Sequence, residues 1–405
     1  MNPLVYALPV FFGAIAIELW LVHRKNKMAL YDLADAITSA HMGVFMLVVS
    51  VFVNFAVYNV VFDNFRFAEW PTDSVLMWVL ALLFYDFCYY WVHRLGHEVS
   101  WVWASHIVHH SSEYYNLSTA MRQTASGKLV VWVFYLPMAL AGVPPKMYLV
   151  VGLIDLLYQF WVHTELVGRL GWFDRIFVSP SNHRVHHGQN DYCIDKNYGG
   201  LLIIWDRMFG TFAEERAGEK IHYGVRKPLR SYNILWANLH YYVDLWNLSR
   251  TARGWRAKLG VWTAPPGGWT DAPIEHFDGG HFERFAPVVA PAMRYYAATQ
   301  SVVLLIFAVH CIAVAGSLPL AQGLAYGGLM AVGYMSIGLL LQGTAWARTL
   351  ELARVLGMGV ALGAAGNWFG FDMPMVARAV GVLWALISAF HLMRPGVRAS
   401  QGVAA

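Results

Sequence analysis

Charged residues are scarce in this chain. Asp, Glu, Lys and Arg make up 13% of its 405 residues, whereas a soluble globular domain carries about 25%. Hydrophobic residues make up 58%, so the composition favours a protein whose surroundings are largely lipid. The formal net charge is only +4. In a membrane protein such a small excess is typical of basic cytosolic loops, and it argues against nucleic-acid binding.

Cysteine is also scarce, and the motifs of several common cofactors are absent. Cys88, Cys193 and Cys311 form no CxxC pair and suggest no disulfide framework. Without a thiolate cluster, the sequence argues against an iron–sulfur site. It also contains no haem segment of the cytochrome b5 type and no GxGxxG between a strand and a helix. Electrons for a redox reaction would therefore have to arrive from outside the chain.

Long apolar runs, in contrast, are frequent. An α-helix crosses a bilayer with roughly 20 apolar residues. We predict spans at residues 4–22, 44–61, 76–92, 299–314, 324–341, 353–365 and 375–392. Two shorter arms, 129–141 and 147–162, flank Pro144 and Pro145. These prolines cannot continue a helix, so we expect a tilted hairpin there rather than a re-entrant pair.

The basic residues predict one orientation of these spans. With the N-terminus outside, residues 24–27, the polar region 164–290 and the arginines beside the later spans all fall on the cytosolic side. The expected fold is all-α, a polytopic helical membrane protein with a cytosolic cap. We expect N-terminal transmembrane helices over 1–70, a catalytic domain with the cap over 71–290, and C-terminal transmembrane helices over 291–405. The membrane is expected to be the inner (cytoplasmic) membrane in a bacterium and the endoplasmic reticulum in a eukaryote.

Histidine has the most uneven distribution of all residue types. Nine of the 17 histidines gather near predicted span ends or in polar loops: His93, His97, His106, His109, His110, His163, His183, His186 and His187. Residues three and four apart share a helix face, so His93 with His97, and each HxxHH group, can aim imidazoles at one point. Two histidines four apart are a recurrent metal-binding device. We therefore predict a histidine-rich metal site at the cytosolic ends of the helices.

A structural role is the alternative interpretation, and it applies best to single residues. A lone histidine such as His310 is more often a packing residue than a ligand. Five histidines within eighteen residues, 93–110, would repel one another when protonated and would be costly to bury. Metal coordination compensates for both effects. Nine imidazoles exceed the four ligands of a usual zinc site, so we predict two ions.

The spacing of the histidines leaves iron and zinc open. Zinc would suit hydrolysis, and iron would suit oxygen chemistry. The location favours iron, because a site next to lipid meets substrates that are largely unactivated hydrocarbon.

At these histidines the sequence resembles the fatty acid hydroxylase/sterol desaturase superfamily of membrane di-iron enzymes, and within it the alkylglycerol monooxygenase family. The stretches that carry the resemblance are residues 93–99, 106–123, 158–165 and 181–210. Three histidine boxes are specific for the superfamily. The segments SSEYYNLSTAMRQ and YCIDKNYGG between and after them carry the narrower assignment. The resemblance is strong over residues 74–215 and fades beyond them.

The resemblance implies a reaction and a set of functional residues. Activated oxygen on two iron ions would hydroxylate the carbon next to the ether oxygen of a glyceryl ether, and the product would collapse to an aldehyde and a glycerol derivative. It implies O2 as oxidant, tetrahydrobiopterin as electron donor and a membrane lipid as substrate. By the family pattern the eight box histidines are required, Glu98 is functional, and His163 is a ninth ligand. A pterin-regenerating or electron-transfer protein would be the partner.

Two other functions remain open from the sequence. The same di-iron site could act on a sterol, fatty acyl chain or carotenoid, as a hydroxylase or desaturase with a ferredoxin or cytochrome as electron donor. A metal transporter or sensor would instead place its histidines at mid-membrane depth in several spans. Here they lie at span ends and in polar loops, which argues against transport.

Overall fold

The computed structural model describes residues 4–52, 56–269 and 276–394. The longer helices are α1 (Leu4–Arg24), α2 (Leu33–Ser50), α3 (Ala56–Phe65), α4 (Val75–Glu98), α10 (Pro145–Trp161), α13 (Ile234–Thr251), α14 (Trp255–Thr263), α15 (Pro291–Val314), α16 (Leu320–Leu341), α17 (Ala347–Ala364) and α18 (Met375–Met393). Shorter helices are α5 (Ser100–Trp103), α6 (Ile107–His110), α7 (Leu117–Ala120), α8 (Gly127–Val130), α9 (Leu136–Ala141), α11 (Pro180–His186) and α12 (Ile204–Phe209). Within the described residues the only strands, β1 (Asn367–Trp368) and β2 (Phe371–Asp372), form a small antiparallel hairpin. The expected all-helical fold is confirmed.

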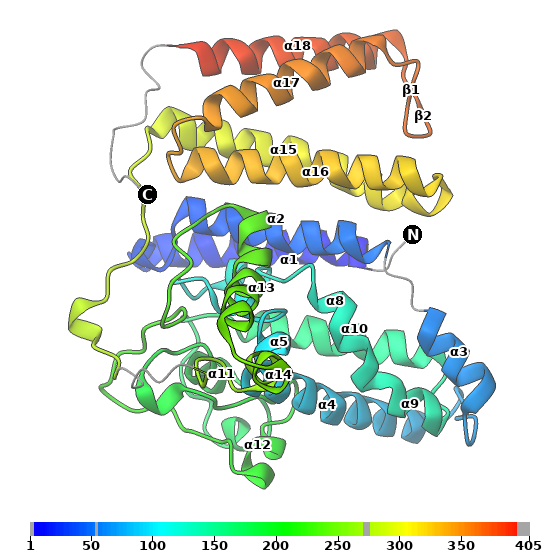
Figure 1. Cartoon of the computed structure of the whole chain (residues 1–405), viewed down its shortest axis with the longest axis vertical. Coiled ribbons are helices and arrows are strands. Elements are labelled where there is room, and N and C mark those ends of the chain that lie inside the picture. Colours follow the sequence, from blue (N-terminus) through cyan, green and yellow to red (C-terminus); the bar gives the residue numbers. More distant parts are fainter. Residues whose placement is uncertain (1–3, 53–55, 270–275, 395–405) are drawn as a thin grey trace.

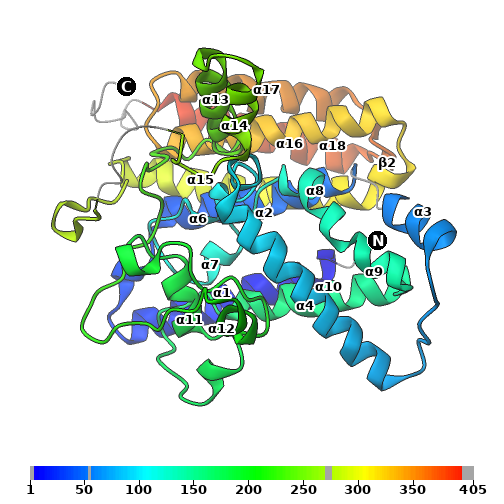
Figure 2. The same cartoon turned by 60° about the horizontal axis from the view of Figure 1, so that its bottom comes forward.

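Five helices of the described residues are long and apolar enough to cross a membrane: α2, α4, α15, α16 and α18. Helix α1 covers the first predicted run. Helices α15 and α16 pack against α2, and α17 and α18 form the next layer beyond them. The histidine-bearing region lies on the other side of α1 and α2, as Figures 1 and 2 show. The chain is thus a polytopic membrane protein in which α1 and α2 lie between the C-terminal helices and the histidine-bearing region.

The second predicted span is wrong in its position. A single helix over 44–61 was expected, but α2 begins at Leu33 and ends at Ser50, and α3 starts separately at Ala56. Asp32 caps α2, since its carboxylate accepts hydrogen bonds from the backbone N–H groups of Ala34 and Asp35. The first turns of α2 are polar yet buried, because their side chains bond to other segments. Hydropathy alone therefore placed the start too late.

The expected turn between the two short arms is present. Helix α9 is followed by Gly142, whose φ of 96° is left-handed, and α10 begins with Pro145 as its first residue. A Cβ at Gly142 would lie 1.9 Å from the carbonyl oxygen of Ala68, so only glycine fits there. The first arm is shorter than expected, because α8, a 3-10 turn over Val131–Tyr135 and α9 replace one helix. Helix α10 packs on α4, and the ends of the two helices bring His93, His97 and His163 into the same region.

Candidate metal centre

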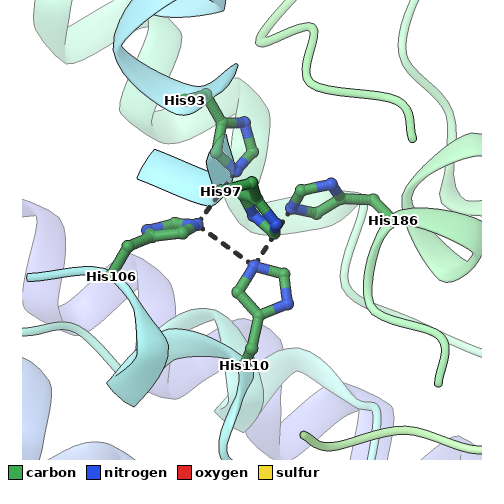
Figure 3. A group of neighbouring side chains, drawn as sticks. All are labelled: His93, His97, His106, His110 and His186. Atoms are coloured by element: carbon green, nitrogen blue, oxygen red, sulfur yellow. Dashed lines mark hydrogen bonds between the residues drawn. The ribbon is translucent and has the colours of Figure 1, made fainter. Parts of the chain in front are cut away.

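Five imidazoles from three segments surround one point, which we call site A. His93 and His97 extend from the last turns of α4, His106 precedes α6, His110 ends α6, and His186 ends α11. One nitrogen of each lies within 4.8 Å of the others. Figure 3 shows the five rings converging on a common space from different sides. All are buried except His106, which is partly buried.

Four further imidazoles form a neighbouring group, site B. His109 comes from α6, His163 follows α10, and His183 and His187 lie on and just after α11. The Nε2 atom of His163 lies 3.3 Å from Nε2 of His109 and 3.0 Å from Nε2 of His183. The rings of His110 and His187 stack with their centroids 4.3 Å apart, so the two sites are adjacent.

The two HxxHH groups do not each serve one point, as the spacing alone suggested. His106 and His110 belong to site A, whereas His109 belongs to site B. In the second group His183 and His187 belong to site B, and His186 belongs to site A. Histidines four apart share a helix face, while adjacent ones point in different directions. Each HxxHH group therefore links the two sites and holds them side by side.

The nitrogen spacings in site A suit an ion with more than four ligands. The Nε2 atom of His106 lies 3.0 Å from Nε2 of His93 and 3.1 Å from Nε2 of His110. The Nε2 atoms of His110 and His186 are 3.1 Å apart. Two nitrogens bound at about 2.1 Å lie about 3.0 Å apart at a right angle and about 3.4 Å apart at the tetrahedral angle. These three spacings, in a group of five donors, fit a transition metal such as iron better than a four-coordinate structural zinc ion.

Backbone carbonyls orient four of the nine imidazoles. A carbonyl oxygen can only accept, so the Nδ1 atom that faces it carries the proton and Nε2 keeps a free lone pair. The contacts are His93 Nδ1 to Tyr198 O at 2.8 Å, His109 Nδ1 to Arg122 O at 3.0 Å, His163 Nδ1 to Gln159 O at 2.8 Å, and His186 Nδ1 to Lys196 O at 2.9 Å. In each ring the Nε2 atom that faces its site is the one able to bind a cation.

Other imidazole nitrogens are buried without any partner. They are Nε2 of His97, Nε2 of His187 and Nδ1 of His183. Leaving a buried polar atom unsatisfied costs about 1–3 kcal/mol. A metal ion in each site would satisfy His97 and His187. Both the donor set and these unpaired atoms therefore fit a pair of metal ions.

Burial keeps seven of the imidazoles neutral, all of them outside α4. It lowers the pKa of His109 to about 4, and it holds the pKa of six others well below their usual range: His106, His110, His163, His183, His186 and His187. The charge on neighbouring imidazoles lowers these pKa values further. At neutral pH the rings are uncharged, which is the form that binds metal.

Two buried carboxylates that sequence reasoning missed hold the loop that orients His93. Asp206 accepts hydrogen bonds from the backbone N–H groups of Tyr198 and Gly199, each at 2.8 Å. Asp86, in the middle of α4, accepts from the N–H of Leu201 at 2.7 Å. Together they fix the position of the Tyr198 carbonyl. An acidic residue inside a predicted span is itself a signal of function, and Asp86 could have been found that way.

A third missed carboxylate lies outside the histidine-bearing segments. Asp35 of α2 forms a buried ion pair with Arg122, and Ser39 accepts from Nε of Arg122 at 3.1 Å. The carbonyl of Arg122 is the group that orients His109. Asp35 also accepts from the hydroxyl of Ser112, two residues after His110. Helix α2 thus anchors the segment that carries ligands of both sites.

Glu98 lies apart from both histidine groups. It is the last residue of α4, its side chain is 39% exposed, and it accepts from Nε of Arg94 at 2.9 Å. A different acid faces site A, because the carboxylate of Asp195 lies 3.8 Å from Nδ1 of His97. The structure thus brings together all nine predicted histidines and leaves Glu98 at the rim.

Comparison with known proteins identifies relatives of this chain. The family described as fatty acid hydroxylase matches residues 78–211, which include all nine histidines. The chain is 43% identical over 310 residues to alkylglycerol monooxygenase of Danio rerio, covering 74% of this chain and 68% of that relative. It is 42% identical over 267 residues to alkylglycerol monooxygenase of Homo sapiens, covering 64% and 59%. It is 46% identical over 236 residues to the Xenopus tropicalis protein of that name, covering 58% and 52%. The alignments thus span about half to two thirds of these relatives' own length. No solved structure gives a significant match.

Proposed function

The chain belongs to the alkylglycerol monooxygenase family, and on that premise we propose that it cleaves glyceryl ethers by oxidation within the membrane. The observation that carries the proposal is the division of nine buried imidazoles into two adjacent groups. The similarity to alkylglycerol monooxygenases supports the choice of substrate.

The proposed reaction inserts one oxygen atom of O2 into a C–H bond of the carbon next to the ether oxygen. The other oxygen atom takes up two electrons and two protons and leaves as water. Tetrahydrobiopterin supplies the electrons. The hemiacetal then breaks its bond to the ether oxygen and gives a fatty aldehyde and a glycerol derivative. Iron bound at the two sites would supply the activation of O2 that an unactivated C–H bond requires.

The residues of this chain have three tasks in that reaction. The nine histidines named above hold two ions through their inner nitrogens, and their burial excludes water from the site. The carbonyls of Tyr198 and Arg122 keep His93 and His109 in the ligating tautomer. Glu98 follows His97 directly, and we assign it a role as hydrogen-bond acceptor or proton-transfer group at the rim of site A.

The broader organisation follows from the same proposal. Residues 71–290 form the catalytic domain, whose polar part caps the helices on the cytosolic side. Residues 1–70 and 291–405 supply the flanking helices, in the inner membrane of a bacterium or the endoplasmic reticulum of a eukaryote. A protein that regenerates the pterin or transfers electrons is the expected partner.

A second candidate keeps the metal pair and changes the substrate. The match to the fatty acid hydroxylase family favours it, because that match covers the histidine region without specifying an ether. The substrate would be a sterol, fatty acyl chain or carotenoid, and a ferredoxin or cytochrome would be the electron donor.

The test uses the full chain in nanodiscs, with iron content measured beforehand. An alkylglycerol, O2 and tetrahydrobiopterin are added, and release of fatty aldehyde is followed. We expect aldehyde only with all three, and two iron ions per chain. If a fatty acid or sterol is turned over with reduced ferredoxin and the ether yields no aldehyde, the second candidate function replaces the first. Absence of bound iron after reconstitution would overturn both.

A further inference from the structure

An apolar stripe lies on the exposed face of α13. Trp236, Leu239, Val243 and Trp246 follow one another at intervals of three and four, so they share one side of the helix. All four are exposed, and Trp246 is 59% exposed. The opposite side is buried through Ile234, Ala237, Asn238, Leu245 and Ser249. The helix is therefore amphipathic, but part of its apolar surface faces away from the protein.

Helix α14 extends this surface. Trp255 and Leu259 are exposed on it at 68% and 56%, and the ring of Trp269 packs against Gly260. Five of the 18 tryptophans of the chain lie within residues 236–269. Tryptophan is the residue most typical of the boundary between lipid tails and head groups. We call the exposed apolar side chains of the two helices the tryptophan face: Trp236, Leu239, Val243, Trp246, Trp255 and Leu259.

The chain beside the tryptophan face is basic. Residues 245–270 contain no Asp or Glu, and they include Arg250, Arg253, Arg256 and Lys258, all exposed. The nearest acid, Asp244, is paired with Lys227 at 2.8 Å. A basic, tryptophan-rich amphipathic helix is the pattern of a segment that lies in the plane of an anionic lipid surface.

Hydrogen bonds place both ends of this helix pair at the ends of membrane spans. Just before α13, the hydroxyl of Ser231 and the N–H of Tyr232 donate to Gln342, the residue that ends α16, each at 2.9 Å. At the end of α14, the carbonyl of Ala264 accepts from Ser100 N–H at 2.9 Å, two residues after α4 ends. Helix α13 crosses the direction of the spans in Figure 1. It is not among the five helices that could cross a membrane.

From these observations we propose that α13 and α14 form an interfacial hairpin, whose tryptophan face lies in the head-group region of the cytosolic leaflet and binds anionic phospholipid. Asn238 of α13 accepts from the N–H of Ala125 at 2.9 Å, and α13 packs on α6, the helix of His109 and His110. The hairpin thereby holds the histidine sites at a set depth below the lipid surface.

The test measures depth directly and does not depend on turnover. The three native cysteines are buried, so a spin label can be attached at Val243→Cys in the full chain in nanodiscs. Val302→Cys on α15, 59% exposed, is the reference for lipid, and Glu214→Cys is the reference for water. We expect the ratio of collisions with O2 to collisions with a water-soluble nickel chelate to be several-fold higher at Val243 than at Glu214.

A charge-reversed background tests the lipid preference. With phosphatidylglycerol added to phosphatidylcholine, the Val243 label should move deeper, and Arg250→Glu with Arg256→Glu should abolish that movement. A Val243 label as accessible to the nickel chelate as the Glu214 label would overturn the proposal. That result is also the one expected if the face serves to bind another protein rather than lipid. Equal depth with and without phosphatidylglycerol would refute the recognition of anionic lipid. Neither result bears on ether cleavage, so the two proposals fail separately.

Discussion

The histidine region and the C-terminal helices both bury ionisable side chains in an apolar chain, but they treat them in opposite ways. In the C-terminal helices Glu351 accepts from Arg354, from the Tyr296 hydroxyl at 2.7 Å and from the Ser336 hydroxyl at 2.7 Å. Both carboxylate oxygens are satisfied. In the histidine region, by contrast, Nε2 of His97 and Nε2 of His187 are buried without a hydrogen-bond partner.

The difference separates a structural polar cluster from a binding site. A fully paired buried cluster stabilises one arrangement of helices and needs no ligand. A cluster with unpaired lone pairs on one side and carbonyl contacts on the other is arranged for an ion. Four predictions sharpen this comparison.

The largest effect is expected at site A. His110→Ala removes a ligand whose ring also stacks on His187 of site B. Loss of an outer partner of a metal ligand costs about 10–100-fold, so loss of the ligand itself should lower aldehyde release by more than about 100-fold. Iron content and turnover should fall together. His310→Ala, in which the lone histidine of α15 is removed, is the control and should retain two ions.

The paired cluster should respond in stability instead. Glu351→Ala leaves the guanidinium of Arg354 buried and unpaired, which costs about 3–5 kcal/mol. The midpoint of thermal unfolding should drop, while the remaining folded protein still binds two ions. Replacing both partners, Glu351→Met with Arg354→Leu, should recover most of the loss. Iron depletion without loss of stability would assign this cluster to the metal centre.

A smaller effect is expected at the link between α2 and site B. Asp35→Asn weakens the ion pair that fixes Arg122, and thereby the carbonyl that orients His109. Metal affinity should fall about 10–100-fold, seen as one of two ions lost early in a chelator titration. Asp73→Asn, an exposed acid outside both regions, should release both ions as the unaltered chain does. Unchanged release would show that α2 has no part in orienting site B.

The smallest effect on stability is expected at Glu98. Its pair with Arg94 is partly exposed, and such pairs contribute at most about 1 kcal/mol. Glu98→Gln should therefore fold and bind iron normally. A lower kcat with a changed pH profile would support the proton-transfer role. Unchanged kcat and KM would limit Glu98 to its surface pair.

Much of the site could be predicted from the sequence because metal ligands have a narrow chemistry. The nine histidines, the all-helical fold and the family resemblance all follow from the sequence. The start of α2 does not, because its polar first turns look incompatible with a span. Asp35 and Arg122, which bury those turns, are 87 residues apart, and no local pattern connects them.

The sequence by itself determined which side chains can bind metal and which segments prefer lipid, since both depend on residue type and helical spacing. Only the tertiary structure decided how each HxxHH group divides between two sites, which carbonyls orient four of the rings, and which way the tryptophans of α13 face. Those features depend on contacts between distant segments, and the direction of a side chain in space follows from packing rather than from its neighbours in the chain.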